Sequence, residues 1–299
     1  MRMNRQDRRK LEAISKTEYA RFEAFLKSHQ PKNITWDGGT VSYLFSGEGK
    51  RCALTLAGGW GGADMLYETI LGLEGDSRVL AVDVSSFAGP KELAEAVDRV
   101  LDAEGIDRVV LVGQSMGGIL GQVYFRENPD RVEGMVLINT IAPRPERCKK
   151  WALVLLRALP FRVFKLFAKK SLARLGRYKT DIPTEIEERL RFKNVFVSIN
   201  FNRLVSKSRI SNALELAYHL NGRGGYTLEE LNGWPGRLHL ITSEDDPYFP
   251  DIELFQKAFS RISLFHLPKG YGHVAPQIFR DEFFAEIRRF IRGLESEAP

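Results

Sequence analysis

Apolar positions along the chain predict a sheet wound with helices. Short apolar runs, typical of buried strands, alternate with longer stretches whose apolar residues recur every three or four positions, typical of helices. Because the connections are short, we expect a mostly parallel, twisted sheet with helices on both faces, the α/β class. The expected strands are 52–56, 79–84, 109–112, 135–139, 238–242 and 264–267. The expected helices are 63–73, 90–104, 116–126, one that begins at 251, and 277–292.

Three regions depart from this alternation. Residues 1–30 have the spacing of a charged helix, and residues 34–45 predict a hairpin. Residues 141–226 are helical in pattern throughout. We therefore expect a helical extension at 1–31, an α/β core formed by 32–140 and 227–299, and an all-helical insertion at 141–226.

The composition is that of an ordinary globular protein, with 43% hydrophobic and 27% charged residues among 299. No apolar run approaches the ~20 residues of a membrane-spanning helix, so no transmembrane segment is expected. The basic stretch around Arg5 is not followed by the apolar stretch of a secretory signal. Cys52 and Cys148 are too few for a disulfide framework or a metal cluster. We expect a cytoplasmic protein with two free thiols.

Positive charge is concentrated in one segment. The chain carries a net charge of +6, whereas the window 144–180 holds twelve Lys or Arg and one acid, Glu146. The window therefore carries +11 and the rest of the chain sums to −5. Such a local excess of positive charge indicates what the protein could bind and does not indicate its fold. Nucleic acid is not expected, because these cations belong to an insertion in an otherwise acidic protein.

A serine lies between an expected strand and an expected helix. The sequence Gly113-Gln114-Ser115-Met116-Gly117 directly follows the strand 109–112. Short motifs arise by chance, but a serine on a strand-to-helix turn has a sharply bent backbone that needs small residues two positions before and after it. Gly113 and Gly117 occupy those positions. The helix N-terminus also favours developing negative charge, so Ser115 is predicted to be a nucleophile.

A serine hydroxyl needs a base, and the chain has five histidines. His29 precedes the core, His219 lies in the helical insertion, and His239 and His266 fall inside expected strands, where a packed or half-exposed residue is the simpler interpretation. His273 alone lies on a glycine-flanked loop after the last strand. From there an imidazole can reach the carboxyl edge of the sheet, and we predict His273 as the base.

The imidazole in turn needs a carboxylate that holds its tautomer and stabilises its protonated form. After the strand 238–242 the chain continues as Ser243-Glu244-Asp245-Asp246. By position, Glu244, Asp245 and Asp246 are all candidates. The two acids that do not bond to the histidine are most simply interpreted as solvated carboxylates of an acidic turn.

Together these residues resemble the α/β-hydrolase superfamily, in its serine esterase and lipase-like branch. The resemblance covers 32–140 and 227–299 and rests on the strand–serine–helix turn, the order Ser…Asp…His and a helical cap inserted after the sixth strand. The family's acid commonly lies in a G-x-x-D-x-x-x-P turn, where Asp246 takes the acid position; its alternative acid position holds Asn139. The resemblance implies a triad of Ser115, Asp246 and His273, with 141–226 as the cap.

The resemblance also implies an oxyanion hole made of two backbone N–H groups. One belongs to Met116, and the other to the loop Ala57-Gly58-Gly59-Trp60-Gly61-Gly62, in which Gly59 is the first choice and Trp60 the second. These glycines fit a flexible turn, but a backbone that approaches a ligand closely explains them better. Trp60 and Gln114 are expected to contact the substrate.

The implied function is a serine hydrolase that cleaves a carboxylic ester or thioester through an acyl-enzyme on Ser115, with an apolar acyl group. It needs no cofactor and no metal, and the sequence has no ligand cluster or dinucleotide fingerprint. Two alternatives remain: a carbon–carbon bond hydrolase or lyase that uses the same triad, and a non-catalytic receptor or scaffold. The presence of all three triad residue types disfavours the second.

The expected cap combines aromatic residues with the cationic window. Apolar residues of 161–175 share one helical face, with Arg162, Lys165 and Lys169 on the adjacent stripe. The simplest interpretation is core packing beneath a solvated basic face. The alternatives are an apolar acyl tunnel, and a basic surface that docks an anionic lipid surface or an acidic acyl carrier protein. Docking to lipid would place the protein peripherally at a membrane.

Overall fold

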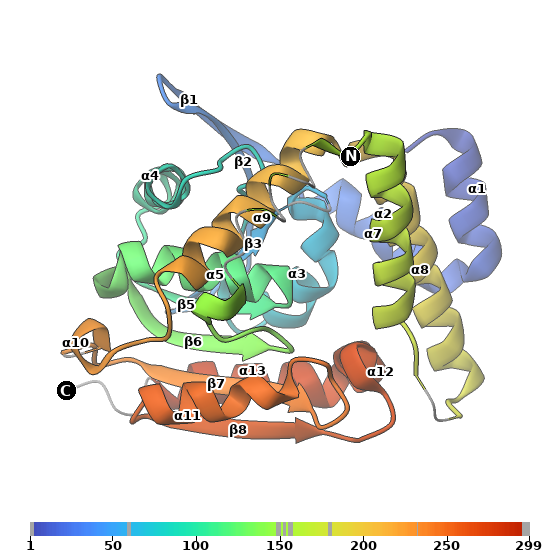
Figure 1. Ribbon diagram of the computed structural model, residues 1–299. Helices are drawn as coiled ribbons and strands as arrows, with labels where there is room; N and C mark the ends of the chain where they lie inside the picture. Colours follow the sequence, from blue (N-terminus) through green and yellow to red (C-terminus); the bar gives the residue numbers. More distant parts are fainter. Residues whose placement is uncertain are drawn as a thin grey trace.

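The structure is a computed structural model that describes residues 3–58, 61–147, 151, 154, 158–178, 181–231 and 233–294. Its centre is an eight-stranded sheet in the order β1-β2-β4-β3-β5-β6-β7-β8 (Figure 1). β2 pairs antiparallel with β1 and with β4. The six strands β3 to β8 are parallel to one another. This sheet, with helices on both faces, confirms the predicted α/β class.

The described elements follow the expected alternation from β3 onward. The strands are β1 (Lys32–Trp36), β2 (Gly39–Ser46), β3 (Cys52–Ala57), β4 (Arg78–Asp83), β5 (Val109–Gln114), β6 (Val132–Ile138), β7 (Arg237–Ser243) and β8 (Ile262–Leu267). The α-helices are α1 (Arg5–Ile14), α2 (Lys16–Ser28), α3 (Tyr67–Leu73), α4 (Pro90–Ala103), α5 (Met116–Glu127), α7 (Phe161–Leu175), α8 (Thr184–Leu204), α9 (Lys207–Gly222), α10 (Leu228–Leu231), α11 (Ile252–Ala258), α12 (Ala275–Ile278) and α13 (Arg280–Gly293).

Each face of the sheet has its own core, because successive residues of a strand point to opposite sides. In β4, Leu80 and Val82 belong to the core beneath α4, α5 and α11. Val79 and Ala81 belong to the core beneath α3 and α13. Full burial of a Leu or Val side chain contributes about 1.5–3 kcal/mol. The central strands are therefore apolar at consecutive positions, which is why they appear in the sequence as short unbroken apolar runs.

Residues 3–30 form two helices, whereas the spacing predicts one over 1–30. Ser15 has an extended backbone, and its hydroxyl accepts a hydrogen bond from the N–H of Glu18 at the start of α2 (3.4 Å). Phe22 of α2 packs edge-on against Tyr67 of α3 and Phe196 of α8, with ring centroids 5.0 and 4.7 Å apart. The N-terminal helices therefore link the helix layer of the sheet to a helix of 141–226.

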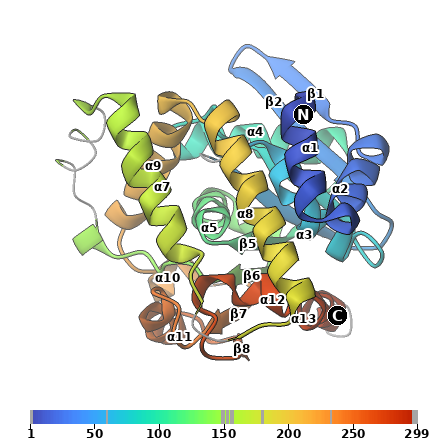
Figure 2. The same ribbon diagram turned by 90° about the vertical axis from the view of Figure 1, so that its right-hand side faces the viewer.

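Between β6 and β7 the described residues contain helices and no strand. Lys193 of α8 lies 2.6 Å from Glu68 of α3, and Arg209 of α9 lies 2.7 Å from Asp83 at the end of β4. Figure 2 shows α7 and α8 toward the viewer, with α5 seen along its axis between them. These helices lie over the carboxyl edge of the parallel strands. Among the described helices, none has the length and apolar character needed to cross a bilayer.

Candidate active site

Ser115 forms the turn between β5 and α5. Its backbone has φ 53° and ψ −117°, a conformation that a residue with a side chain rarely adopts. Neighbouring groups hold it there: its N–H donates to the carbonyl of Ile138 (2.9 Å), and its own carbonyl accepts from the hydroxyl of Thr140 (2.7 Å). Backbone strain of this kind costs on the order of 1–3 kcal/mol and is concentrated at functional sites.

Close backbone packing requires the glycines around Ser115. A Cβ on Gly113 would lie 2.6 Å from the carbonyl oxygen of Gly117, and a Cβ on Gly118 would lie 2.8 Å from the side chain of Thr140. A Cβ on Gly117 would meet the carbonyl oxygen of the neighbouring β3 at 3.2 Å, which is a milder contact. The elbow can keep this shape only if the residues two positions before the serine and two and three positions after it remain small.

The start of α5 offers backbone N–H groups beside Ser115. Met116 and Gly117 are its first two residues, so their N–H groups have no carbonyl partner within the helix. The helix dipole adds partial positive charge at this end. The predicted donor Met116 thus directly follows the serine, whereas Gly59 and Trp60 lie outside the described residues.

His273 and Asp246 come together from the loops that follow β8 and β7. Nδ1 of His273 lies 2.6 Å from Oδ2 of Asp246, whose side chain is fully buried. Oδ1 of Asp246 accepts a hydrogen bond from the N–H of Tyr248 (2.7 Å), and the Tyr248 ring packs edge-on against the imidazole. Because a carboxylate accepts, Nδ1 carries the proton and Nε2 is the basic nitrogen.

The turn that carries His273 lies at the ends of β5 and β6. The backbone carbonyl of His273 accepts hydrogen bonds from the side-chain amides of Gln114 (3.5 Å) and Asn139 (3.3 Å). Gln114 directly precedes Ser115, and its amide also bonds to that of Gln277 (3.0 Å). The structure therefore brings Ser115, Asp246 and His273 to one edge of the sheet. Gln114, predicted to contact substrate, has its amide engaged in this positioning.

Asp245 is not the solvated carboxylate that an acidic turn would provide. Its Oδ2 accepts hydrogen bonds from the N–H groups of Gly270 (3.0 Å) and Gly272 (3.1 Å), and its Oδ1 accepts one from the hydroxyl of Ser243 (2.5 Å). Burial acts to raise the pKa of the Asp245 carboxyl, but these hydrogen bonds to the charged form outweigh it, so the pKa is lowered. Asp245 thus fixes the loop that precedes His273.

Two other histidines have roles in packing. His239 is buried in β7, where it stacks on Phe290 and its Nδ1 lies 2.8 Å from the hydroxyl of Ser263. Burial lowers the pKa of His239 to about 4, so its imidazole is neutral at physiological pH. His29 lies 2.7 Å from Glu74, far along the chain from the loops described above.

Asn139 and Thr140 help to position the site, and sequence reasoning assigned them no such role. Asn139 has φ 42°, a conformation in which asparagine is enriched, and its amide bonds to the turn of His273. The available signal was a pair of polar residues directly after an apolar strand, at the edge where parallel strands present ligands.

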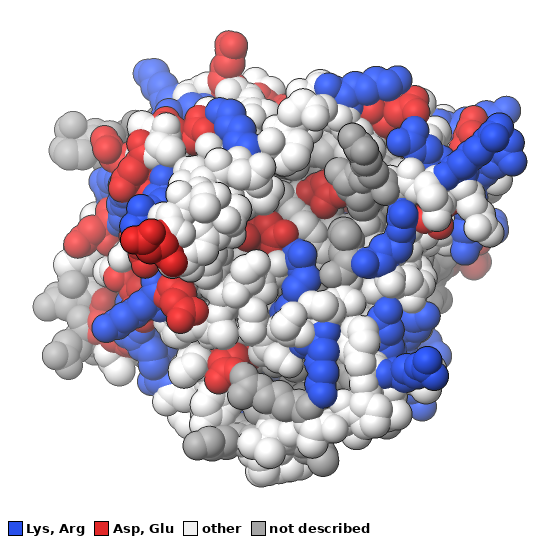
Figure 3. All heavy atoms as spheres, turned by 90° about the horizontal axis from the view of Figure 1, so that it is seen from above, with Lys and Arg blue, Asp and Glu red and all other residues white. Residues whose placement is uncertain are grey.

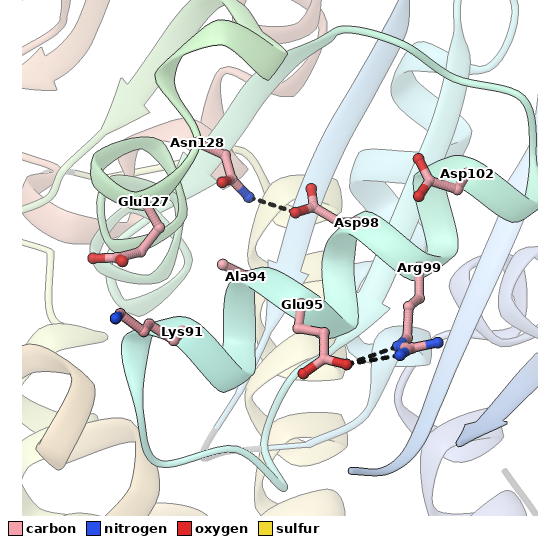
Figure 4. A pocket seen from close by; sticks show the side chains of 8 residues that line it. All are labelled: Lys91, Ala94, Glu95, Asp98, Arg99, Asp102, Glu127 and Asn128. Carbon is pink, nitrogen blue, oxygen red and sulfur yellow. Dashed lines mark hydrogen bonds and ion pairs between the residues drawn. The ribbon is translucent and has the colours of Figure 1, made fainter. Parts of the chain in front are cut away.

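A separate groove of about 510 Å³ lies between α4 and the end of α5 (Figure 4). Two of its acids are engaged within the groove: Asp98 accepts a hydrogen bond from Asn128 (2.7 Å), and Glu95 pairs with Arg99 (2.8 Å). The other two, Asp102 and Glu127, pair with arginines outside its lining. In the part of the chain that the structure describes, no three His, Cys, Asp or Glu side chains are arranged to hold a metal ion.

A mostly parallel eight-stranded sheet whose fifth strand ends in a strained serine elbow is the architecture of the α/β hydrolases. The chain belongs to that family: the family model described as alpha/beta hydrolase fold matches residues 58–276. The family resemblance inferred from the motifs is thereby confirmed.

Individual relatives agree with this family. Over 111 residues the chain is 30% identical to "Putative carbamate hydrolase RutD" of Variovorax paradoxus (strain S110), a match that spans 33% of this chain and 42% of that protein. The structure is similar to a thermophilic esterase from Thermogutta terrifontis, with TM-score 0.66 and 18% identity over 89% of this chain and 99% of that one. It is also similar to carboxylesterase CesB from Bacillus subtilis, with TM-score 0.62 and 15% identity over 94% and 99% of the two chains. At these identities the structural likeness shows a shared fold.

Proposed function

We propose that the protein is a serine hydrolase that cleaves a carboxylic ester or thioester, with Ser115 as the nucleophile. The observation that carries the proposal is the position of Ser115, on a strained elbow at the same sheet edge as the His273–Asp246 pair. Nucleophile, base and orienting carboxylate then occur in the order and surroundings that acyl transfer needs. The esterases among the structural neighbours share the fold that holds these groups.

In this mechanism Nε2 of His273 takes the proton from Ser115 Oγ as the oxygen attacks the substrate carbonyl. Asp246 stabilises the imidazolium through Nδ1. The N–H of Met116 stabilises the oxyanion, and we assign the second donor to Gly59 before Trp60. His273 then protonates the alkoxide or thiolate leaving group and activates the water that releases the carboxylic acid. A carbamate presents a similar carbonyl, so an aryl carbamate belongs beside esters in a substrate panel.

A fluorophosphonate probe tests the proposal directly, because it reacts covalently with activated serines. We expect the wild-type protein to be labelled at Ser115, as mapped by mass spectrometry of the modified peptide. The Ser115→Ala variant should not be labelled, and its kcat on p-nitrophenyl esters should fall by roughly four to six orders of magnitude. Ser260→Ala, at an exposed position outside the site, serves as the control and should match the wild type.

Three outcomes would contradict the proposal. Retention of a tenth of the wild-type activity in Ser115→Ala would remove this serine from the mechanism. An unlabelled, inactive wild-type protein would favour the non-catalytic receptor or scaffold. Turnover of a carbon–carbon substrate by a protein that is inert toward every ester and thioester would shift the function to the other alternative.

A further inference from the structure

The exposed large apolar side chains of the described residues are Trp151, Val154 and Leu166, with exposed fractions of 66%, 59% and 68%. All three lie in the window 144–180, which also carries the excess of positive charge. Single exposed apolar residues are common on protein surfaces and need no explanation. Their confinement to one strongly cationic segment does need one.

The outward side of α7 places Leu166 among cations. Arg162 lies four positions before it, and Lys169 and Lys170 lie three and four positions after it, so these residues share one helical side. Arg174 extends the same side by a further turn, and all five residues are exposed. We name these five residues the α7 face. No ion pair joins its four cations to another residue that the structure describes.

Three other cations of the window are engaged within the protein. Arg144 and Arg147 both pair with the buried Asp251, at 2.8 and 2.5 Å. Lys165 is half-buried and donates a hydrogen bond to the carbonyl of Asn202 (3.2 Å). The α7 face therefore presents charge that a partner can use, and Lys165 is not part of it.

The helix that carries the α7 face lies next to the candidate active site. α7 contacts the turn of residues 272–274, which carries His273, and the carbonyl of Arg177 would lie 3.8 Å from a Cβ on Gly272. Figure 2 shows α7 beside α5, which is seen along its axis. In Figure 3, Lys and Arg gather toward the right, the side on which Figure 1 shows both α7 and the basic N-terminal helix α1. A surface bound to the α7 face would thus lie beside the sheet edge that carries Ser115.

We propose that the α7 face docks the protein on an anionic phospholipid surface. Each Lys or Arg near such a surface contributes about fivefold in affinity, and Leu166 suits the boundary between headgroups and acyl chains. Apolar side chains that stand singly among cations match this boundary better than a protein partner, whose interface has a contiguous apolar centre. The docking does not depend on the chemistry of Ser115.

Vesicle co-sedimentation of the full chain tests the docking. We expect the wild-type protein to bind vesicles that contain phosphatidylglycerol and not vesicles of phosphatidylcholine alone. Affinity should fall steeply as salt rises past 0.1 M, where the Debye length is about 10 Å. The combined change Lys169→Gln, Lys170→Gln and Arg174→Gln should lower affinity roughly 100-fold, from three cations at about fivefold each. Leu166→Ser should lower it about tenfold and leave the salt dependence in place.

The matched control is Lys91→Gln, Arg108→Gln and Lys257→Gln, which removes the same charge from exposed positions outside the cap. It should change affinity less than about threefold, because distant charges are screened. Circular dichroism verifies that each variant is folded. The proposal is wrong if wild type ignores acidic vesicles at low salt, if the α7 variant binds as well as wild type, or if the control loses as much. Binding of an acidic acyl carrier through the α7 face, without vesicle binding, would assign the surface to that partner instead.

Discussion

At the scale of single residues, neighbouring carboxylates in the turn after β7 have different surroundings. Asp246 is buried and bonded to His273, whereas Glu244 is exposed and lies 3.9 Å from Lys269. We expect Asp246→Asn to lower kcat by about 10³–10⁴-fold, because the imidazole loses the partner that fixes its tautomer. Glu244→Gln should stay within about tenfold, because an exposed pair contributes little. Steady-state kinetics on a p-nitrophenyl ester measure both, and a larger loss at Glu244 would mean that the acid has been misassigned.

Asp245 acts on the site through the backbone of the histidine loop, so its variants should separate positioning from chemistry. Asp245→Ala removes the acceptor for Gly270 and Gly272, and we expect kcat to fall about 10- to 100-fold through misplacement of the imidazole. Asp245→Asn can still accept from those N–H groups while its NH₂ donates to Ser243, so it should stay within about tenfold. Equal losses in the two variants, measured as kcat and KM separately, would show that charge rather than hydrogen bonding matters there.

Sequence reasoning located Ser115 and His273 because their local patterns are distinctive: a serine between glycines at a strand end, and a histidine on a glycine-flanked loop. Asp246 needed the family pattern, since three acids share its turn. Asn139 and Asp245 could not be placed in advance. Their partners are backbone groups 134 and 25 to 27 residues away, and only the folded chain brings them together.

At the scale of elements, the elbow depends on how closely α5 approaches β5. Gly113→Ala would push a Cβ to 2.6 Å from the carbonyl oxygen of Gly117, so the elbow must shift, and we expect activity to fall at least about 100-fold. Gly121→Ala is the matched control within α5, because its Cβ would meet Leu111 at an ordinary 3.9 Å. It should keep activity and raise the free energy of unfolding by about 0.5–1 kcal/mol, since alanine favours helix. Activity assays and denaturant unfolding check both, and an active Gly113→Ala protein would show that the elbow tolerates displacement.

The ends of elements were harder to predict than their order. β6 begins at Val132, whereas the apolar run predicts a start at Met135, because Glu133 and Gly134 interrupt that run. Glu133 pairs with Arg51, and Gly134 leaves room for Leu294 after α13, whose side chain would lie 2.8 Å from a Cβ there. Both exceptions reflect tertiary contacts. A short-range sequence pattern does not predict such contacts.

At the scale of the whole molecule, the alternation of strands and helices predicted the sheet, whereas the attachment of 141–226 to it was not predictable. That attachment uses Phe22, Tyr67 and Phe196, which meet from three separate segments, and ion pairs such as Lys193–Glu68. The apolar spacing within each of these helices does not indicate which other helix it contacts. The N-terminal helices therefore pack against 141–226 as well as against the helix layer of the sheet. The charged-helix pattern of 1–30 did not predict this contact.

The Lys193–Glu68 pair makes this attachment testable through pH. Burial acts to raise the pKa of the Glu68 carboxyl, but Lys193, with smaller contributions from Arg280 and Arg21, outweighs it, so the pKa is lowered. A lowered pKa means that the pair's contribution to stability is complete above the ordinary carboxyl pKa and is lost as pH falls through the lowered one. Lys193→Met leaves a buried carboxylate without its ammonium partner, and near neutral pH we expect it to lower the free energy of unfolding by roughly 2–4 kcal/mol.

On acidification the deficit of Lys193→Met should shrink, because protonation of Glu68 removes the uncompensated charge. Adding Glu68→Gln to Lys193→Met should recover most of the loss at neutral pH for the same reason. Lys269→Met, which breaks the exposed pair with Glu244, is the control and should cost less than about 1 kcal/mol at any pH. Urea unfolding at pH 7 and pH 4 measures each difference. A deficit that is equal at both pH values, or absent at pH 7, would mean that this ion pair does not hold α8 to α3.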